Sequence, residues 1–394
     1  MATIRRELFP GEVLFRQGDP AGCAWLVEHG EIVLQVESEA GPQPPRVFGP
    51  GELIGELALL DGAPYRATAV ARGDAILLAI DADQFDERLG ASDPIVKALV
   101  DSLRSRMRAL QEALPEGTPL PLEDQPCDDP EERAGIAKIH FETRLREALD
   151  EASLEVHYQP IYDIQAGRVR SYEALVRWRH ETLGQVSPAE FIRLAEETSL
   201  IVPLGEYVLD RAIAVLQGLH AAHGDDVPSI AVNLSARQLV QPGMARQVVA
   251  RAERAGLPPG ALKLEVTESR MLDYAPVAAV MQHCRGHGIP FALDDFGTGY
   301  SNLTHLHALE FEFVKVDQAF CRHMLDSARA MAIVEAIVAM AHGIGAQVIM
   351  EGVETCEQLA ELRRMGVRHA QGWLVGKAQP AEAVLSGEAA AVTP

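Results

Sequence analysis

The stretch FALDDFGTGYSN, residues 291–302, begins like a buried strand and then breaks off in a way that a protein core does not require. Three apolar residues lead to two adjacent aspartates, Asp294 and Asp295, and the glycines Gly297 and Gly299 flank a threonine. Aspartate and glycine are common where strands turn, so a plain turn is one interpretation. The other is that both carboxylates serve a site beside a flexible loop. The ends of the neighbouring strands decide between the two.

From about Lys138 onward, strand-like apolar runs alternate with amphipathic helical stretches such as PAEFIRLAEETS (188–199). Eight such alternations in about 250 residues predict an α/β fold, a TIM-like (β/α)8 barrel. The predicted strands are LEVHYQPI (154–161), SYEALVRW (171–178), SIAVNLS (229–235), LKLEVTES (262–269), PFALDDFG (290–297), FEFVKVD (311–317), QVIMEGV (347–353) and AQGWLV (370–375).

In such a barrel the C-terminal ends of the strands converge on one mouth, where active sites lie. The polar groups at those ends are Glu173, Asn233, Glu265, Asp294, Asp295, Lys315, Asp317, Glu351, Glu354 and Gln371. Carboxylates gathered this closely repel one another unless a cation lies among them. Oxygen ligands without histidine or cysteine favour Mg²⁺ or Mn²⁺, and so many acids suit a pair of ions that clamps the oxygens of a phosphodiester. We therefore interpret Asp294 and Asp295 as a metal-binding strand end, with Lys315 holding water or stabilising charge on the phosphate.

The first ninety residues have a different pattern, because short strands alternate there with glycine and proline turns. Such spacing predicts a small all-β roll with flanking helices. Over 93–114 the apolar residues step by four and three, the spacing of a heptad seam that either packs on its own domain or joins a homodimer. Residues 115–137 are acidic and rich in proline, as linkers are. We expect two domains, 1–114 and 138–394, joined by this linker.

The composition excludes some classes of protein. A net charge of −22 argues against binding to a nucleic-acid backbone, so no DNA partner is expected. The five cysteines show no paired spacing, which is typical of reduced thiols in the cytoplasm. No signal segment is evident at the start, and the most apolar stretch, Met331–Met350, is too polar for a membrane span because it contains Glu335 and His342. We expect a cytoplasmic protein without a membrane partner.

The stretch GELALLDGAPYRATAV (55–70) predicts a phosphate site in the N-terminal domain. A short helical turn follows Gly55, and the N–H groups at a helix start bind phosphate. Arg66 can hold phosphate oxygens bidentately, and Glu56 can accept a hydrogen bond from a ribose hydroxyl. A solvated turn is the alternative for any one residue, but the combination with a β-roll favours a nucleotide pocket.

Residues 141 to about 388 resemble the EAL-domain family of cyclic di-GMP phosphodiesterases. The matching motifs are YQPI (158–161), EALVRW (173–178), NLS (233–235), EVTES (265–269), DDFGTGYSN (294–302), VKVD (314–317), EGVET (351–355) and QGWLVG (371–376). The resemblance implies a barrel enzyme that uses two Mg²⁺ or Mn²⁺ ions to linearise cyclic di-GMP to pGpG. The alternative is a catalytically weak cyclic di-GMP receptor whose N-terminal domain serves mainly for dimerisation.

The same resemblance implies a role for each polar residue at the mouth. The implied ligands are Glu173, Asn233, Glu265 and Asp294 for one metal ion and Asp294, Asp295 and Glu351 for the other. The implied catalytic residues are Lys315, Glu351 and Glu268, of which Glu268 would anchor the loop after Asp295. The implied substrate contacts are Gln159, Arg177, Asp317, Glu354 and Gln371.

Residues 1 to about 114 resemble the cyclic-nucleotide-binding domain family. The resemblance implies a pocket made by Gly55, Glu56, Leu57, Ala58, Arg66, Ala67 and Thr68. Ala67 stands where a threonine tends to favour cGMP in that family, so cAMP rather than cGMP is the expected ligand. Tyr65 departs from the family pattern by separating Pro64 from Arg66, which suggests a longer loop. The two resemblances together predict a cAMP-regulated phosphodiesterase.

Overall fold

The computed structural model describes residues 5–37, 44–82, 85, 100, 141–180, 183–198, 200–224, 226–267, 274–297 and 306–387. The predicted heptad helix (93–114, apart from Val100) and the predicted linker (115–137) lie outside these residues. The chain divides into two compact units, Met1–Glu151 and Ala152–Pro394. Each unit is considered by itself.

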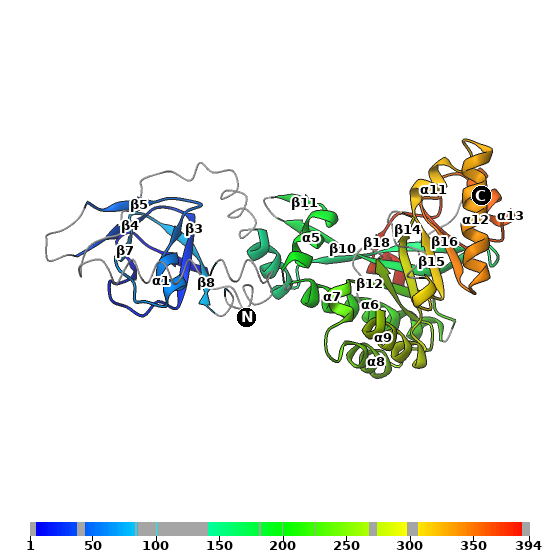
Figure 1. The fold of residues 1–394 in the computed structure, drawn as a ribbon, viewed down its shortest axis with the longest axis horizontal. Helices are drawn as coiled ribbons and strands as arrows, with labels where there is room; N and C mark the ends of the chain where they lie inside the picture. Colours follow the sequence, from blue (N-terminus) through cyan, green and yellow to red (C-terminus); the bar gives the residue numbers. More distant parts are fainter. Residues whose placement is uncertain are drawn as a thin grey trace. The chain divides into compact units, whose positions relative to one another are not determined.

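The N-terminal unit contains two four-stranded antiparallel sheets, with the orders β1-β8-β3-β6 and β2-β7-β4-β5 (Figure 1). Their strands are β1 (Arg5–Leu8), β2 (Val13–Phe15), β3 (Cys23–His29), β4 (Ile32–Gln35), β5 (Arg46–Phe48), β6 (Leu53–Ile54), β7 (Thr68–Ala71) and β8 (Ala75–Asp81). The helix α1 (Glu56–Asp61) follows β6 and packs against β3. Trp25 and Leu77 from one sheet share a core with Ile32 and Ala69 from the other. The predicted all-β roll is confirmed.

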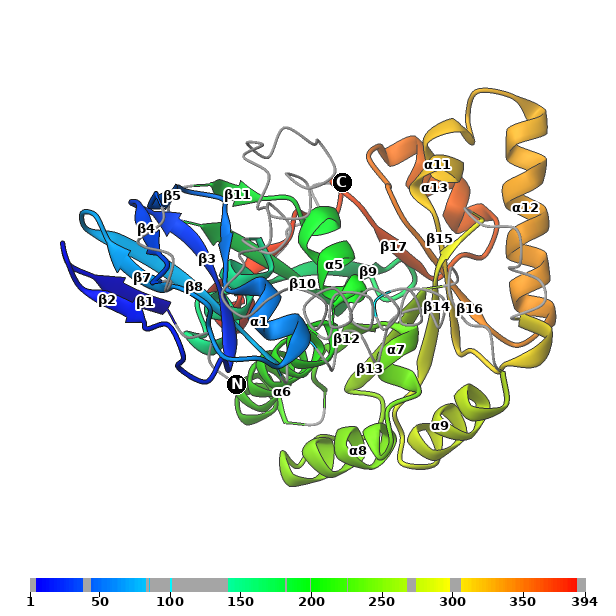
Figure 2. The same cartoon turned by 60° about the vertical axis from the view of Figure 1, so that its left-hand side comes forward.

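The C-terminal unit contains an eight-stranded barrel, and each of the eight predicted strands contributes to it (Figures 1 and 2). Of the last predicted strand, 370–375, only Ala370 and Gln371 lie in a barrel strand, and a turn follows them. Around the barrel the strands are β9 (Glu155–Asp163), β10 (Arg168–His180), β12 (Ser229–Leu234), β13 (Leu262–Thr267), β14 (Phe291–Phe296), β15 (Phe313–Val316), β16 (Gln347–Met350) and β17 (His369–Gln371). The sheet closes because β9 pairs with both β10 and β17. Two short strands, β11 (Gly184–Val186) and β18 (Gln379–Pro380), pair with β10 and β9.

One strand departs from the regular alternation that the sequence suggests. β9 is antiparallel to both of its neighbours, and a turn over 164–167 rather than a helix leads from it to β10. From β10 through β17 the paired barrel strands are parallel. The start of β9, and not its end, therefore lies at the mouth, where Gln159 pairs with Glu173.

The helices follow the parallel strands. They are α5 (Pro188–Glu197), α6 (Ile201–His223), α7 (Ala236–Leu239), α8 (Met244–Arg254), α9 (Tyr274–Gly286), α11 (Gln318–His323), α12 (Ala328–Gly343), α13 (Cys356–Arg364) and α14 (Ala381–Leu385). α7 and α13 begin with capping boxes, in which Ser235 pairs with Gln238 and Thr355 with Gln358. No helix in the described part of the chain is long and apolar enough to cross a membrane.

The barrel interior changes from apolar to polar toward the mouth. Ile161, Ala292, Phe313 and Ile349 form a buried apolar cluster. Residues two apart on a strand face the same side, so the polar residues two positions nearer the mouth stand directly above this cluster. The apolar cluster therefore forms the floor beneath these polar residues.

Candidate active site

The two adjacent aspartates of the opening stretch lie at a β-bulge. Pairing between β14 and β15 shifts register between Leu293 and Phe296, and Asp295 has a φ of 55°. In a regular strand adjacent side chains point to opposite faces, whereas a bulge redirects one of them. A left-handed φ on a residue other than glycine stores strain, a feature that clusters at functional sites. The bulge explains why both carboxylates reach one site.

Two groups of acids meet at the mouth and share Asp294. Glu173, Glu265 and Asp294 each offer an oxygen within 4.8 Å of the others, and so do Asp294, Asp295 and Glu351. These residues come from β10, β13 and β14 and from the position after β16. The predicted convergence of the five acids is thus observed.

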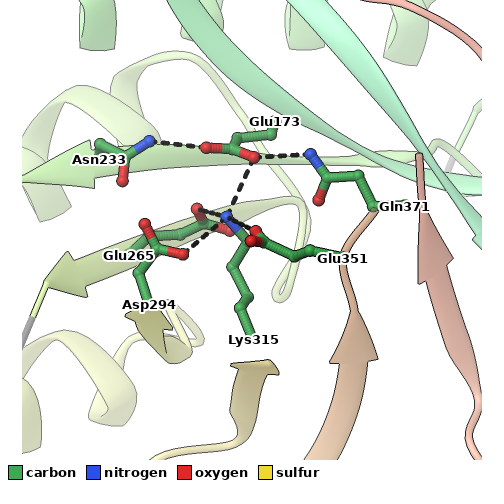
Figure 3. Close-up of polar contacts among 7 residues, drawn as sticks. All are labelled: Glu173, Asn233, Glu265, Asp294, Lys315, Glu351 and Gln371. Carbon is green, nitrogen blue, oxygen red and sulfur yellow. Dashed lines mark hydrogen bonds and ion pairs between the residues drawn. The ribbon is translucent and has the colours of Figure 1, made fainter. Parts of the chain in front are cut away.

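Lys315 of β15 lies at the centre of these acids (Figure 3). Its Nζ lies 3.0 Å from Glu173, 2.8 Å from Glu265, 2.9 Å from Asp294 and 2.9 Å from Glu351. The side chain is 1% exposed. Burial alone would lower the pKa of Lys315, but the four carboxylates hold it well above its usual value. The ammonium group is therefore a charged counter-ion to the surrounding acids.

Two amide side chains donate hydrogen bonds to Glu173, a member of the first acid group. Asn233 Nδ2 donates to Glu173 Oε1 at 2.9 Å, and Gln371 Nε2 donates to Glu173 Oε2 at 2.7 Å (Figure 3). Burial raises the pKa of Glu173, but Lys315 and these two amides outweigh that effect and lower it overall. Glu173 is thus held as a carboxylate.

Three other acids of the site have raised pKa values. Burial raises the pKa of Glu351 to about 7 and that of Asp295 to about 6, and it raises the pKa of Glu265 well above the usual value. Glu265 Oε1 is buried and has no hydrogen-bond partner among the described residues. When all five acids are ionised, one ammonium leaves four negative charges, which is the charge that two divalent ions neutralise. Oxygen donors of this kind suit Mg²⁺ or Mn²⁺, so these residues fit the expected metal pair.

The other predicted mouth residues differ in their surroundings. Gln159 lies directly opposite Glu173 across the β9–β10 pair, and Arg177 lies further along β10. Asp317 accepts a hydrogen bond from Ala319 N at 2.8 Å and so caps α11. Glu354 is exposed after β16. The predicted catalytic residue Glu268 lies outside the described residues.

Two further residues of the β9–β10 ribbon, Glu155 and His157, were not among the predicted site residues. Both stand at even spacing from Gln159, so the period of two in a strand places all three on one face. The half-exposed His157 and Gln159 alternate with the buried Val156 and Tyr158. That alternation was readable in the sequence once the strand had been assigned.

The predicted nucleotide-pocket residues lie on α1 and on the segment leading into β7. Gly55 caps α1 with a φ of 78°, and a Cβ there would lie 2.8 Å from the Tyr65 ring, so close packing also favours glycine. Glu56 is half-buried, and burial raises its pKa. Arg66 is exposed and Ala67 is buried. Completing this set are the half-buried Leu57 and Thr68 and the buried Ala58.

Tyr65, the departure noted in the sequence, is a core residue. Its ring stacks on Phe15 at 3.7 Å between centroids, and its hydroxyl donates to Cys23 O at 2.5 Å. Its backbone exchanges hydrogen bonds with the turn at Gly18 and Asp19. The residue before Arg66 thus anchors the loop to the β-roll.

Two family models match the chain. The model described as EAL domain matches residues 142–378, and the model described as cyclic nucleotide-binding domain matches residues 5–91. Among curated relatives, the cyclic di-GMP phosphodiesterase NbdA of Pseudomonas aeruginosa is 40% identical over 248 residues, which is 63% of this chain and 32% of NbdA. The cyclic di-GMP phosphodiesterase PdeR of Escherichia coli is 37% identical over 247 residues, which is 62% of this chain and 37% of PdeR. The chain spans from about a third to a half of the length of such relatives.

Solved structures extend the similarity to both units. The EAL enzyme Bd1971 in its cAMP-bound form is 27% identical with a TM-score of 0.61, covering 97% of this chain and 99% of that one. Its form bound to cAMP and cyclic di-GMP is 28% identical with a TM-score of 0.62 and the same coverage. The PaMucR phosphodiesterase in complex with c-di-GMP is 38% identical with a TM-score of 0.58, covering 62% of this chain and 99% of that one.

Proposed function

The chain belongs to the EAL domain family, and we propose that it is a phosphodiesterase that hydrolyses cyclic di-GMP to pGpG with Mg²⁺ or Mn²⁺. The observation that carries the proposal is the pair of buried acid groups that share Asp294 around Lys315. A barrel that merely bound a nucleotide would not need five converging carboxylates, since the substrate is itself an anion that they would repel.

The residues at the mouth have separate proposed roles in metal binding and in catalysis. Glu173, Asn233, Glu265 and Asp294 would hold one ion, and Asp294, Asp295 and Glu351 the other. When bound, the two ions would supply positive charge to the phosphate and a nucleophilic water at neutral pH. Lys315, already surrounded by these acids, would hold that water or stabilise charge that develops on the phosphate.

The proposed substrate contacts at the mouth differ in where they lie and in what they touch. Gln159 lies opposite Glu173 on the ribbon, Arg177 lies further along β10, and Gln371 touches Glu173 directly. Glu354 and Asp317 stand after β16 and β15, and Asp317 is engaged in capping α11. Glu268 is retained as a proposed anchor of the loop after Asp295.

Hydrolysis by the purified chain of 394 residues tests the proposal. Cyclic di-GMP is incubated with Mg²⁺, with Mn²⁺ and with a chelator, and pGpG is quantified by chromatography. We expect product with either metal and none with the chelator. Tight binding of cyclic di-GMP without any product would instead identify a receptor.

We further propose that the N-terminal unit binds cAMP, in preference to cGMP, and raises the activity of the barrel. The family match over 5–91 and the Bd1971 neighbours, which include cAMP-bound and cGMP-bound forms, support a nucleotide ligand. We also propose the domain limits 1–114, 115–137 and 138–394 and a homodimer through 93–114. A ligand changes activity only by binding two conformational states of the protein with different affinity. A dimer seam is an element that can adopt two such states.

Arg66→Ala is expected to abolish the response to cAMP while leaving basal hydrolysis unchanged. The exposed guanidinium is the proposed partner of the cyclic phosphate. Coupling between two sites is typically about 1–3 kcal/mol, so cAMP should change the parental rate or substrate affinity by roughly 5- to 150-fold. Initial rates with and without cAMP measure this effect.

Arg72→Ala is the matched control, because Arg72 is an exposed arginine of the same unit that pairs with Glu31 at 3.0 Å. Its response to cAMP should equal that of the parent. If cAMP binds the parent tightly in calorimetry yet leaves both rate and KM unchanged, the N-terminal unit does not regulate the barrel.

A further inference from the structure

The β9–β10 ribbon carries a row of side chains that leads outward from the acids. Register between the two strands is unbroken from Ser171 opposite Ile161 to Arg177 opposite Glu155. Directly opposite residues in an antiparallel pair share a face, as do residues two apart. Because Glu173 faces Lys315, the pairs Leu175–His157 and Arg177–Glu155 face the same side as Glu173–Gln159.

Burial supports this assignment of faces. Leu175, Arg177, His157 and Gln159 are half-buried, whereas the residues between them are buried. Tyr158 is 1% exposed and Trp178 is 1% exposed, as expected for side chains packed under the helices. The half-buried row thus lies on the side that is open at the mouth.

His157 lies two residues nearer the mouth than Gln159, the pairing partner of Glu173. This spacing is about 7 Å along the strand. Its Nε2 lies 2.8 Å from Glu155 Oε2, and its side chain is 25% exposed. A carboxylate that holds one ring nitrogen fixes the orientation of the ring and leaves the other nitrogen for a ligand. The contact with Glu155 engages Nε2 and not Nδ1.

The chemistry of the proposed reaction requires a proton on the oxygen that leaves. Hydrolysis to pGpG joins a hydroxyl group to phosphorus and breaks the bond from phosphorus to the 3′-oxygen, whose electron pair stays on that oxygen. The oxygen must then gain a proton. The acids and Lys315 gather where the ions and the attacking water would lie, whereas His157 faces the adjoining part of the mouth.

We propose that His157, oriented by Glu155, donates a ring proton to the leaving 3′-oxygen of cyclic di-GMP. The ring becomes neutral in that step and regains its proton from water. The inference rests on the proposed phosphodiesterase function and adds to it the group that assists departure of the alcohol. His180, on the same ribbon, does not suit the role because it contacts Trp178 on the other face.

Comparing two substrates isolates this step. The leaving alcohol of cyclic di-GMP needs a proton, whereas the nitrophenolate released from bis(p-nitrophenyl) phosphate does not. His157→Gln is expected to lower kcat on cyclic di-GMP by roughly a hundredfold or more, the usual contribution of a general acid. KM for cyclic di-GMP and kcat on the aryl phosphodiester should each stay within about threefold of the parent. Unchanged aryl turnover also shows that the variant is folded.

Two companion variants sharpen the result. Glu155→Gln should reduce kcat on cyclic di-GMP by a smaller factor, roughly tenfold, because the ring keeps its proton but loses its carboxylate partner. His323→Gln is the matched control, since His323 also pairs with a carboxylate, that of Asp326 at 2.8 Å, but is 64% exposed at the end of α11. It should match the parent on both substrates.

The outcomes distinguish a failure of the proposed phosphodiesterase function from a failure of the proposed role of His157. If the parent hydrolyses neither substrate, the phosphodiesterase function itself is wrong, and the role of His157 falls with it. If the parent is active and His157→Gln loses both substrates equally, or changes only KM, His157 is a structural or binding residue and the inference is overturned. A variant as active as the parent on cyclic di-GMP overturns it as well.

Discussion

Glu173→Ala is expected to reduce hydrolysis of cyclic di-GMP by at least about a hundredfold. Glu173 belongs to the first acid group and is the residue on which Asn233, Gln371 and Lys315 all converge. Its loss removes a proposed metal ligand and frees the two amides that it orders, and misplaced metal chemistry of this kind costs several kcal/mol in the transition state. Initial rates in Mg²⁺ and Mn²⁺, together with metal binding by calorimetry, measure the effect.

The fold should survive this change. Lys315 keeps three other carboxylates at 2.8–2.9 Å, so its ammonium is not left alone in the interior. Glu253→Ala, at an exposed position on α8, is the control and should behave like the parent. A Glu173→Ala protein that retains near-parental turnover in Mg²⁺ would show that Glu173 does not hold the metal.

Lys315→Ala is expected to abolish most turnover while cyclic di-GMP still binds within roughly tenfold of the parental affinity. The proposed role of the ammonium lies in the transition state, and an interaction made only there affects kcat rather than binding. Equal losses of binding and rate would make Lys315 a simple substrate anchor. Lys377→Ala, an exposed lysine beside Trp373, is the control of the same chemical type.

The same variant has a second expected result, which concerns stability. In the absence of metal the four carboxylates would lose their buried counter-ion, and breaking such a set typically costs about 3–5 kcal/mol. Lys315→Ala should therefore unfold at a lower temperature than the parent in a chelator and gain more from added Mn²⁺, since the ions replace the lost charge. Thermal unfolding with and without Mn²⁺ tests this, and an equal metal-induced shift in both proteins would contradict it.

The strands and their polar ends were predictable from local pattern. Each of the eight predicted segments overlaps its barrel strand, the last of them only at Ala370 and Gln371, because runs such as SIAVNLS and QVIMEGV combine strand propensity with turn signals at short range. Oxygen ligands without histidine or cysteine also pointed to a hard metal ion before any geometry was available. The strand prediction and the metal prediction both rest on residue type, so neither depends on how the barrel closes.

The reversed direction of β9 was not predictable in the same way. A strand's direction depends on its partners, and β9 pairs with β17 at Asp163–His369, residues far apart in the sequence. The reversal places His157 and Glu155 at the mouth instead of at the opposite end. The sequence analysis had no basis for choosing between these ends, because the alternation of side chains is the same in both directions.

Local sequence pattern is enough to predict a β-roll followed by an α/β barrel whose strands carry acids toward the mouth. The use of those acids depends on long-range contacts: the bulge that turns both Asp294 and Asp295 to one site, and the four carboxylates around Lys315. Glu173 and Lys315 are 142 residues apart, yet their atoms lie 3.0 Å from each other. Local pattern sets the face that a side chain occupies, whereas electrostatic contact depends on distances that only barrel closure establishes.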